Sequence, residues 1–325
     1  MPRIYTVGEL LIDFTAIDVN VSVEDASAFA KHPGGAPANA AVAVAKLGGQ
    51  SSFVGCVGND PFGDYLTGAL KGYGVNADFV ERTDRAPTTL AFVARREGEP
   101  DYFFVRNPGA DVFLSDKNVE SIPFTSDDMV HFGTNSLAEE PIATSVHKMA
   151  KRIREAGGML SIDVNLRPAF WRNPEMAKER LEAFLPDAQL LKCNESELTW
   201  LTGEAEWEKG LAALHQRTDA VVICTLGKGG AVVSVKSGSM PIRVEGFRVE
   251  PVDSTGAGDT FIGAILYQLQ KEGVKSSDLF GVQPASWSEY VRFASAAAAI
   301  SVTRTGAMPS MPTMAEVKEF LSVNQ

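Results

Sequence analysis

The sequence predicts an α/β fold with a mostly parallel central sheet and a small β extension. Apolar strand patterns alternate with helical patterns along most of the 325 residues, as they do in crossover units of parallel sheets. Two β-rich runs, at residues 88–96 and 101–105, break that alternation and indicate a hairpin. No low-complexity linker, long charge run or repeat divides the chain, so one domain over residues 1–325 is expected.

The first part of the chain opens on a predicted strand at residues 3–9, where β-branched and aromatic residues dominate, and that run ends at Asp13. Alanines and regular spacing predict a helix from residue 36, which the glycine pair at 48–49 would end. The pattern then repeats. A strand is expected at 51–58, a helix within 64–74 and another strand at 75–82.

The second part contains strand-like runs at 129–133, 158–165, 188–194, 220–227 and 230–236. Helices are expected at 260–270 and, as a closely packed core helix of small residues, at 290–303. Ligands of such sheets bind beyond the carboxyl ends of the strands. The pattern therefore predicts one rim with the following polar side chains: Asn135, Asp163, Asn165, Asn194 and Thr225.

Composition and charge argue against several classes of protein. Forty-one acidic and thirty basic residues give a formal net charge of −11, which would repel nucleic-acid phosphates and anionic membranes. No run of eighteen apolar residues is free of charge, and the first residues fit no secretory signal. Cys56, Cys193 and Cys224 are odd in number and form no Cys-x-x-Cys pair, so buried thiols in a reducing cytoplasm are expected.

A loop of small residues runs from Asp253 to Asp259 and precedes a helical pattern. The backbone N–H groups of Gly256, Ala257 and Gly258 at a helix N-terminus would form a pocket for an anion such as phosphate. Asp259 would oppose an anion unless it has another task, such as accepting a proton from a substrate hydroxyl. The alternative is that Asp259 merely caps the helix.

Other phosphate-binding and catalytic motifs are missing. Gly227 and Lys228 are followed by Gly229, which rules out a Walker-type loop, and no Gly-x-Gly-x-x-Gly follows the first strand. The four histidines lack metal-ligand spacing, and a Gly-x-Ser-x-Gly elbow is missing. Asn194 and Glu197 lie three apart on one helix face and suit a hydrated magnesium ion; a helix cap followed by solvated glutamates is the alternative.

Two longer motifs are PGGAPANAA at residues 33–41, followed by LGG at 47–49, and DSTGAGDTF at 253–261; shorter ones lie at 8–13, 57–63, 194–197 and 302–310. In this order and separation they resemble the ribokinase-like (PfkB) family of carbohydrate kinases over nearly the whole chain. The resemblance implies a three-layer α/β/α domain with a mostly parallel central sheet. It also implies a small β-sheet lid formed by roughly residues 14–35 and 88–112.

Residues 103–111 and 162–168 are most similar to the corresponding segments of fructokinases. The resemblance therefore implies ATP-dependent conversion of D-fructose to D-fructose 6-phosphate. A kinase of 2-keto-3-deoxygluconate, or another PfkB sugar kinase, is the alternative, because such kinases share an arginine in a segment like that of Arg106. A non-catalytic relative that binds sugar or nucleotide to regulate a partner would have lost the base or the anion hole, yet Asp259, Gly256 and Gly258 are present.

The family's site residues carry over to matching positions of this chain. Implied for catalysis are Asp259 as the base and Gly256, Ala257 and Gly258 as the anion hole. Implied sugar contacts are Asp13, Gly34, Gly35, Asn39, Arg106 and Asp259. Implied nucleotide contacts are Arg167, Asn194, Thr225, Gly227, Gly230, Gly256 and Gly258, with a structural salt bridge as the alternative role of Arg167.

The resemblance also implies ions and an assembly. Asn194 and Glu197 match a magnesium-linked pair that acts through water. A monovalent cation, expected to be potassium, would be held by Asp253, Thr255, Ser301, Arg304, Gly306 and Ser310, largely through main-chain carbonyls. The expected partners are a small-molecule sugar, ATP and a second copy of the chain, paired through the lid; no nucleic acid or membrane partner is expected.

Overall fold

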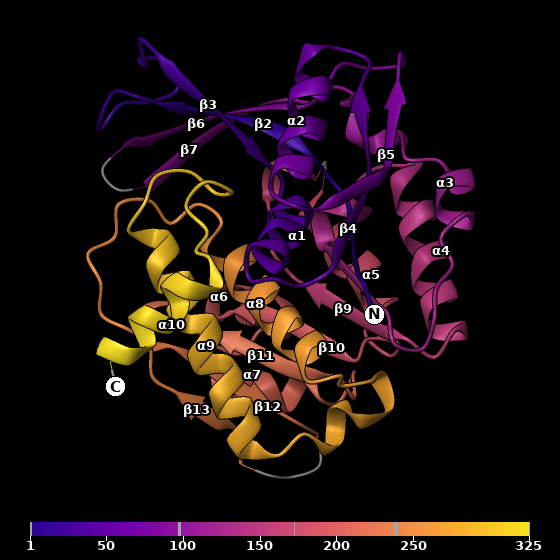
Figure 1. Cartoon of the computed structure of the whole chain (residues 1–325), viewed down its shortest axis with the longest axis vertical. Coiled ribbons are helices and arrows are strands. Elements are labelled where there is room, and N and C mark those ends of the chain that lie inside the picture. Colours follow the sequence, from indigo (N-terminus) through magenta and orange to yellow (C-terminus); the bar gives the residue numbers. More distant parts are fainter. Residues whose placement is uncertain (1, 97–98, 172, 237–239, 325) are drawn as a thin grey trace.

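A large sheet of nine strands lies between two layers of helices, and a smaller sheet of four strands projects from one end (Figure 1). The computed structural model describes residues 2–96, 99–171, 173–236 and 240–324. The order of strands in the large sheet is β13-β12-β11-β10-β9-β8-β1-β4-β5. Neighbouring strands are parallel except at β11-β12 and β12-β13, so the predicted mostly parallel α/β sheet is confirmed.

The strands of the large sheet are β1 (Ile4–Val7), β4 (Ser51–Gly58), β5 (Asn76–Thr83), β8 (Met129–Gly133), β9 (Met159–Asp163), β10 (Leu190–Asn194), β11 (Val221–Thr225), β12 (Ala231–Ser234) and β13 (Ile242–Val244). The helices are α1 (Ala36–Lys46), α2 (Pro61–Gly72), α3 (Asp116–Glu120), α4 (Ile142–Glu155), α5 (Pro174–Glu182), α6 (Glu195–Thr202), α7 (Trp207–Leu214), α8 (Ala257–Lys271), α9 (Pro284–Val302) and α10 (Met314–Val323).

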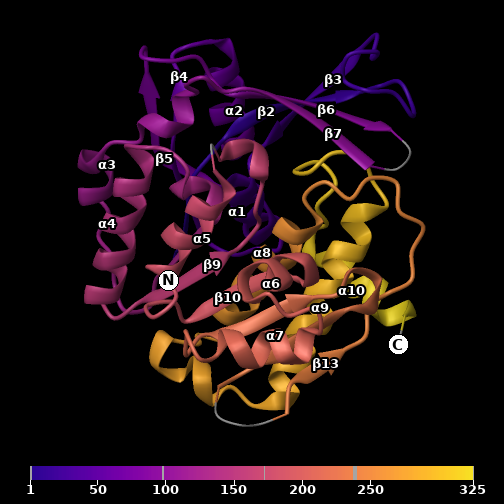
Figure 2. The ribbon, with the colours of Figure 1, turned by 180° about the vertical axis from the view of Figure 1, so that it is seen from behind.

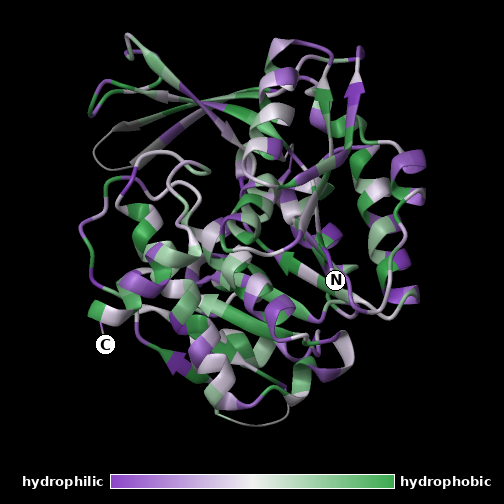
Figure 3. Ribbon diagram, in the orientation of Figure 1, coloured by the Kyte–Doolittle hydropathy of each residue, from purple (hydrophilic) through white to green (hydrophobic). Residues whose placement is uncertain are grey.

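Both faces of the large sheet are buried under helices. Along β1, Ile4 packs into the core beneath α1, α8 and α9, whereas Tyr5 and Val7 pack into the core beneath α4 to α7. Figure 1 shows the first helical layer in front of the sheet and Figure 2 the second. Because neither face meets water, most side chains of the central strands are apolar, with buried polar exceptions such as Lys192 in β10. The covering helices carry apolar residues on one side and polar residues on the other, as Figure 3 shows.

The small sheet has the order β3-β2-β6-β7, with β2 (Leu11–Ala16), β3 (Phe29–Gly34), β6 (Leu90–Arg96) and β7 (Glu99–Val105). The predicted hairpin is confirmed, because β6 and β7 pair antiparallel. The segments expected to form the small sheet, 14–35 and 88–112, contain β3, β6 and β7, whereas β2 begins earlier than expected. Residues 97–98 of the second segment lie outside the described residues.

The N-terminal strand differs from the prediction. β1 ends at Val7, and the chain turns at Gly8, whose φ is +150°, before β2 begins in the other sheet. Asp13 therefore lies within β2, opposite His32 of β3, and not at the end of the first strand. The end of β1 and the start of β2 cannot be located from the sequence, because both strands begin with apolar residues and only three residues separate them.

Helix ends follow local signals. α1 ends at Lys46, just before Gly48 adopts φ +94°, as predicted. α9 begins at Pro284 rather than near residue 290, because proline is favoured in the first turn of a helix.

The three cysteines are buried free thiols, as expected. Among the described helices, none combines the length and apolarity that crossing a bilayer requires.

α1 and α8 pack closely in front of the sheet. A Cβ built at Gly263 of α8 would lie 2.6 Å from the Ala43 Cβ and 2.8 Å from the Ala40 carbonyl oxygen of α1. Only glycine allows this approach without moving a helix. The contact brings the N-terminal turns of both helices to the same edge of the sheet.

Candidate active site

A polar cavity of about 340 Å³ lies at the carboxyl ends of the parallel strands, bounded on one side by the small sheet. Asn135, Asn165, Asn194 and Thr225 line it, so most of the predicted rim is confirmed. Asp163 does not line the cavity; its buried carboxylate instead accepts hydrogen bonds from Lys192. β9 ends at Asp163, two residues before the end of the predicted run at 158–165, and the Asp163 side chain pairs with Lys192 instead of lining the cavity.

A second, apolar cavity of about 450 Å³ adjoins the first and shares Thr225, Ala257 and Gly258 with it. Its walls include the apolar side chains of Phe247, Val249, Phe261, Ala298, Ala299 and Val302, and the predicted nucleotide-side glycines Gly227 and Gly230. The two cavities meet at the N-terminus of α8. A ligand with a polar and an apolar part could therefore span them.

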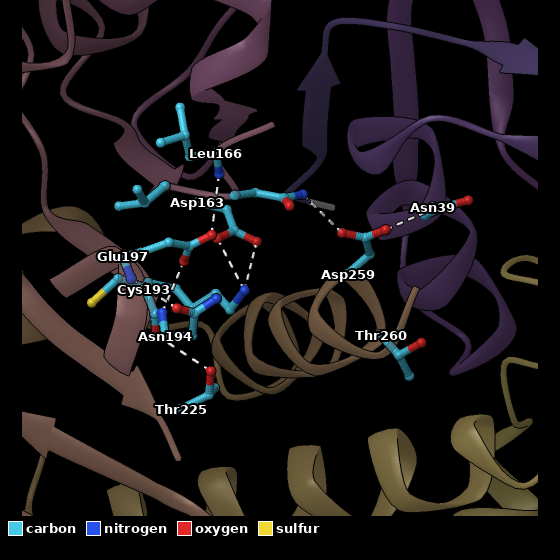
Figure 4. A network of polar contacts seen from close by, with 12 residues as sticks. Asn39, Asp163, Leu166, Cys193, Asn194, Glu197, Thr225, Asp259 and Thr260 are labelled. Carbon is cyan, nitrogen blue, oxygen red and sulfur yellow. Dashed lines mark hydrogen bonds and ion pairs between the residues drawn. The ribbon is translucent and has the colours of Figure 1, made fainter. Parts of the chain in front are cut away.

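Asp259 lies in the first turn of α8, in the wall of the polar cavity (Figure 4). Asn39 Nδ2 donates to its Oδ2 at 2.8 Å, and Asn165 Nδ2 donates to its Oδ1 at 3.3 Å. Burial raises the pKa of Asp259, an effect that the Asn39 hydrogen bond and the charge of Lys192 oppose. The helix-cap alternative is wrong, because the capping position is Gly256 and no side chain caps this helix.

The turn before Asp259 presents backbone N–H groups to the cavity. Gly256 has φ +75°, and a Cβ there would lie 2.9 Å from the Ala307 Cβ, so both conformation and space favour glycine. The Ala257 N–H donates to the Ser254 carbonyl at 3.2 Å. Three backbone N–H groups were predicted to form the anion hole. Of these, the N–H groups of Gly256 and Gly258 have no acceptor among the described residues, whereas that of Ala257 has one.

The part of the cavity near the small sheet is acidic. A Cβ at Gly34 would overlap the Asp13 carboxylate, and one at Gly35, where φ is +105°, would overlap the Glu9 carbonyl oxygen. Burial raises the pKa of Asp13 to about 7, helped by the charges of Asp259 and Asp253. Of the four residues expected to contact the sugar here, Asp13, Gly35 and Asn39 line the cavity, whereas Gly34 lies next to the Asp13 carboxylate and is not part of the lining.

Arg106 is not among the residues that line the cavity. Its Nε and Nη2 donate to Asp111 Oδ2 at 2.9 and 2.7 Å, and its guanidinium carbon lies 4.5 Å from the centre of the Phe170 ring. Phe170 and Phe104 do line the cavity and stack edge to face. Arg106 thus supports an aromatic wall, which differs from the direct contact that the resemblance implied.

Asn194 and Glu197 form a capping box at the start of α6. The Glu197 N–H donates to Asn194 Oδ1 at 2.8 Å, and the Asn194 N–H donates to Glu197 Oε2 at 2.9 Å. Glu197 Oε1 also accepts from the Leu166 N–H at 3.1 Å. The helix-cap interpretation is therefore confirmed, although Glu197 is buried rather than solvated and both residues line the cavity.

Arg167 is exposed and lines the polar cavity. Its Nη1 donates to the Leu166 carbonyl at 3.2 Å, and its N–H donates to Asn135 Oδ1 at 3.1 Å. No carboxylate of the described residues forms an ion pair with it, so the structural salt bridge offered as an alternative is not seen. The guanidinium is available to an anion in the cavity.

The six residues expected around a monovalent cation lie on two adjoining segments. Asp253 Oδ2 accepts from the Gly306 N–H at 2.9 Å, and Asp253 Oδ1 accepts from the Thr255 N–H at 2.9 Å. Arg304 Nη1 donates to the Ser310 carbonyl at 3.5 Å, and Ser301 lies in the last turn of α9, which leads into this segment. The structure thus brings these distant parts of the sequence together.

Two buried charged residues of the cavity lining were not predicted. Lys192 lies in β10 among apolar neighbours, and its ammonium is 3.0 and 2.9 Å from the two Asp163 carboxylate oxygens. Glu9 accepts from the Ala36 N–H at 3.1 Å, and burial raises its pKa to about 7. The only signal in the sequence is a single charge inside an otherwise apolar run.

Comparison with known proteins gives consistent results. The family model described as "pfkB family carbohydrate kinase" matches residues 1–314. Probable fructokinase-4 of Arabidopsis thaliana is 38% identical over 326 residues, which cover 99% of this chain and 97% of that protein. The crystal structure of a Xylella fastidiosa fructokinase with bound ATP superimposes with a TM-score of 0.87 and 33% identity, over 99% of this chain and 98% of the other.

A double-mutant fructokinase of Vibrio cholerae, in its fructose-, ADP- and potassium-bound form, superimposes with a TM-score of 0.88 and 32% identity. The match covers 99% of this chain and 98% of that one. Fold, site and sequence therefore agree, and this chain belongs to the pfkB family of carbohydrate kinases.

Proposed function

We propose that this protein is an ATP-dependent fructokinase that converts D-fructose and ATP to D-fructose 6-phosphate and ADP. The observation that carries the proposal is the position of Asp259, where a polar and an apolar cavity meet beside unpartnered backbone N–H groups. The names of the similar proteins support fructose as the sugar. In this arrangement the sugar would bind in the polar cavity and the nucleotide would reach it from the apolar cavity, with Asp259 between them as the base.

Asp259 acts as the general base in this reaction. Its carboxylate takes the proton of the sugar's primary hydroxyl as that oxygen attacks the γ-phosphorus of ATP, and the bond to the β-phosphate oxygen breaks to release ADP. Burial brings the pKa of Asp259 closer to neutrality and makes it a stronger base once ionised. The N–H groups of Gly256 and Gly258 stabilise charge on the transferring phosphoryl group, next to Ala257.

The sugar binds at the acidic part of the cavity, near Gly34 and Gly35. Asn39 Oδ1 is buried and has no hydrogen-bond partner in the structure, so it is ready to accept from a sugar hydroxyl. The Asp13 carboxylate can hold further hydroxyls. A ketose rich in hydroxyls satisfies these acceptors.

The acidity of this region disfavours the alternative of an acidic sugar. The carboxylate of 2-keto-3-deoxygluconate would approach two acids in the cavity lining, the partly buried Asp13 and the buried Glu9. Arg106, which resembled an acid-binding residue, is already paired with Asp111. A regulatory role without catalysis is disfavoured because Asp259 and the N–H groups of the turn are intact.

The nucleotide occupies the apolar cavity with its base and the polar cavity with its phosphates. Thr225, Gly227 and Gly230 lie beside the base, and Arg167 and Asn194 face the phosphates. Gly230, with φ +88°, leaves no room for a side chain because a Cβ would overlap the Val244 carbonyl oxygen.

Two ions are part of the proposal. The described residues contain no group of three or more His, Cys, Asp or Glu side chains placed to hold a metal. Asn194 and Glu197 therefore suit a magnesium ion held mainly by water and ATP phosphates, which neutralises charge on the β- and γ-phosphate oxygens. The Asp253 carboxylate and the main-chain carbonyls of the segment that contains Gly306 are hard oxygen donors that suit potassium.

The small sheet acts as a lid that excludes water from the reaction, and its outer face pairs two subunits. Phe103 and Val105 on the edge strand β7 are exposed, which is costly for apolar side chains in a monomer. The buried free thiols suit a reducing compartment, and we place the protein in the cytoplasm with no nucleic-acid or membrane partner.

The test is a coupled assay of ADP release with ATP and magnesium, against fructose, ribose, glucose, 2-keto-3-deoxygluconate and adenosine, with and without potassium. Strong preference for fructose supports the proposal. Activity only on the acidic sugar would replace it with the alternative. Nucleotide binding without turnover on any sugar would favour a regulatory role.

A further inference from the structure

Lys192 is a buried cation with no role in the function proposed above. Its side chain is 5% exposed, in a strand whose neighbouring residues are apolar. The Asp163 carboxylate accepts from Lys192 Nζ at 3.0 and 2.9 Å. An ammonium has three N–H groups, and among the described residues no acceptor other than Asp163 is found for Nζ. One N–H group therefore remains for a ligand.

The ammonium lies at the N-terminal turn of α8. A Cβ built at Gly258 would be 2.9 Å from Lys192 Nζ and in contact with little else. The ammonium therefore lies directly beside the turn whose N–H groups face the polar cavity. Lys192 itself lines that cavity, together with Asp259.

The surroundings of the ammonium are strongly anionic. Burial lowers the pKa of Lys192, but the charges of Asp163, Glu197 and Asp259 outweigh this, so its pKa is raised and the group stays protonated. Asp13 and Glu9 add further acidic groups to the same cavity. A triphosphate entering it would be repelled unless buried positive charge were present near its terminal phosphate.

Stability does not explain the buried pair. Removing two charges from water costs about as much as their attraction returns, and well-packed apolar residues at such positions are often as stable or more so. Leu190, Leu191 and Cys193 of β10 are of that apolar kind. Binding of an anionic ligand better explains why a charged pair, with one N–H group that has no acceptor among the described residues, lies at the wall of the cavity.

We propose that Lys192 is a catalytic residue whose ammonium binds the γ-phosphoryl group of ATP and stabilises its charge during transfer, while Asp163 fixes the ammonium in place. This inference rests on the function proposed for the site. Lys192 forms no covalent bond and transfers no proton: the phosphoryl group moves from ADP oxygen to the sugar oxygen, and the sugar's proton goes to Asp259. The lysine acts through charge alone.

Binding measurements test the inference without relying on turnover. Affinities for ADP and for β,γ-methylene-ATP, each with magnesium, are measured by calorimetry for the wild type and for Lys192→Met. The variant is expected to bind the ATP analogue at least tenfold more weakly and ADP within about threefold of the wild type. Equal losses for both nucleotides, or no loss for either, would overturn the inference.

A double variant separates catalysis from folding. Lys192→Met leaves Asp163 buried without its partner, which can destabilise the protein. Lys192→Met with Asp163→Asn removes both charges together. If Lys192 binds the γ-phosphoryl group, the double variant keeps the selective loss for the ATP analogue; if the pair is only structural, the double variant regains wild-type affinity.

Kinetics supply a second readout. Lys192→Ala should lower kcat at least a hundredfold with the KM for fructose within threefold, and added methylamine should restore part of kcat by filling the vacated site. No rescue together with a parallel loss of thermal stability would count against the inference. Lys148→Met is the matched control, because Lys148 forms an ion pair with Asp116 at 3.2 Å on the surface, far from the cavity.

These outcomes are distinguishable from a failure of the proposed function. If the wild type does not phosphorylate fructose, the fructokinase proposal is wrong, but the selective loss of the ATP analogue would still establish the contact made by Lys192. If the wild type is an active fructokinase and the variants lose both nucleotides alike, only the inference about Lys192 is wrong.

Discussion

Asn39 and Asp259 lie 220 residues apart in the chain, yet the Asn39 amide donates to the Asp259 carboxylate at 2.8 Å (Figure 4). One residue belongs to α1 and the other to α8, so the close packing of these helices sets the distance. The amide orients the carboxylate, while the Asn39 carbonyl oxygen has no hydrogen-bond partner among the described residues. A single side chain can therefore position both the base and the sugar.

Replacing Asp259 with asparagine should lower kcat by a factor of about 10³ or more, because an amide cannot accept the hydroxyl proton. ADP affinity should stay within about threefold, since the N–H groups of the preceding turn are unchanged. Single-turnover kinetics and calorimetry measure the two effects. Near-normal turnover in this variant would remove Asp259 from the role of base.

Replacing Asn39 with alanine should shift the pH dependence of kcat. The Asn39 hydrogen bond lowers the pKa of Asp259, so its loss should raise that pKa further. Because the ionised carboxylate is the active form, the acidic limb of the pH–rate profile should move to higher pH, and the KM for the sugar should rise. An unshifted profile would contradict the proposed coupling.

Replacing Gly34 with alanine should raise the KM for fructose at least tenfold, because the new methyl group would displace the Asp13 carboxylate. Gly68→Ala is the matched control: Gly68 lies on the exposed face of α2, and a Cβ there meets nothing within 4 Å. The control should leave the KM unchanged and raise the free energy of unfolding by about 0.5–1 kcal/mol. Steady-state kinetics and denaturant titration measure these effects.

Replacing Arg106 with alanine should raise the KM for fructose more than it changes ATP affinity, through loss of support for Phe170. The change also leaves the buried Asp111 carboxylate unpaired, which should lower the melting temperature. Arg106→Met combined with Asp111→Asn should recover the melting temperature but not the KM. An unchanged KM in Arg106→Ala would show that the aromatic wall does not need this residue.

Stability should depend on pH through Asp13. Its pKa is about 7 in the folded protein, above the usual 3.8, so the folded state binds more protons than the unfolded state in this window. The free energy of unfolding therefore falls as pH rises from about 4 to 7. Asp13→Asn should be more stable than the wild type at pH 8, with the difference shrinking toward pH 4. Thermal unfolding across this range provides the measurement.

Much of the fold could be predicted from short-range patterns. The start and end of α1 follow from its alanines and from the glycines after it, and the β6-β7 hairpin follows from two β-rich runs around a turn. Asn165, Asn194 and Thr225 were expected at one edge because parallel strands end at the same side of a sheet. These features depend only on local propensity and on a general rule of topology.

Other features depend on contacts between distant residues. Nothing local to Asp13 indicates that β2 joins a different sheet from β1. In the sequence, Lys192 is a single charged residue within an apolar strand pattern. Only the structure shows that Asp163 of β9 pairs with it and that Gly258 of α8 lies against it.

The sequence by itself determined the α/β alternation of most strands and helices, the glycine turn before Asp259 and the kinase family, because local backbone preferences and a contiguous motif carry that information. Only the tertiary structure decided which charges face the cavity and which face one another. Burial and pairing depend on how separate elements pack together, whether the paired residues are 29 apart in the chain, as Lys192 and Asp163 are, or 220 apart, as Asn39 and Asp259 are.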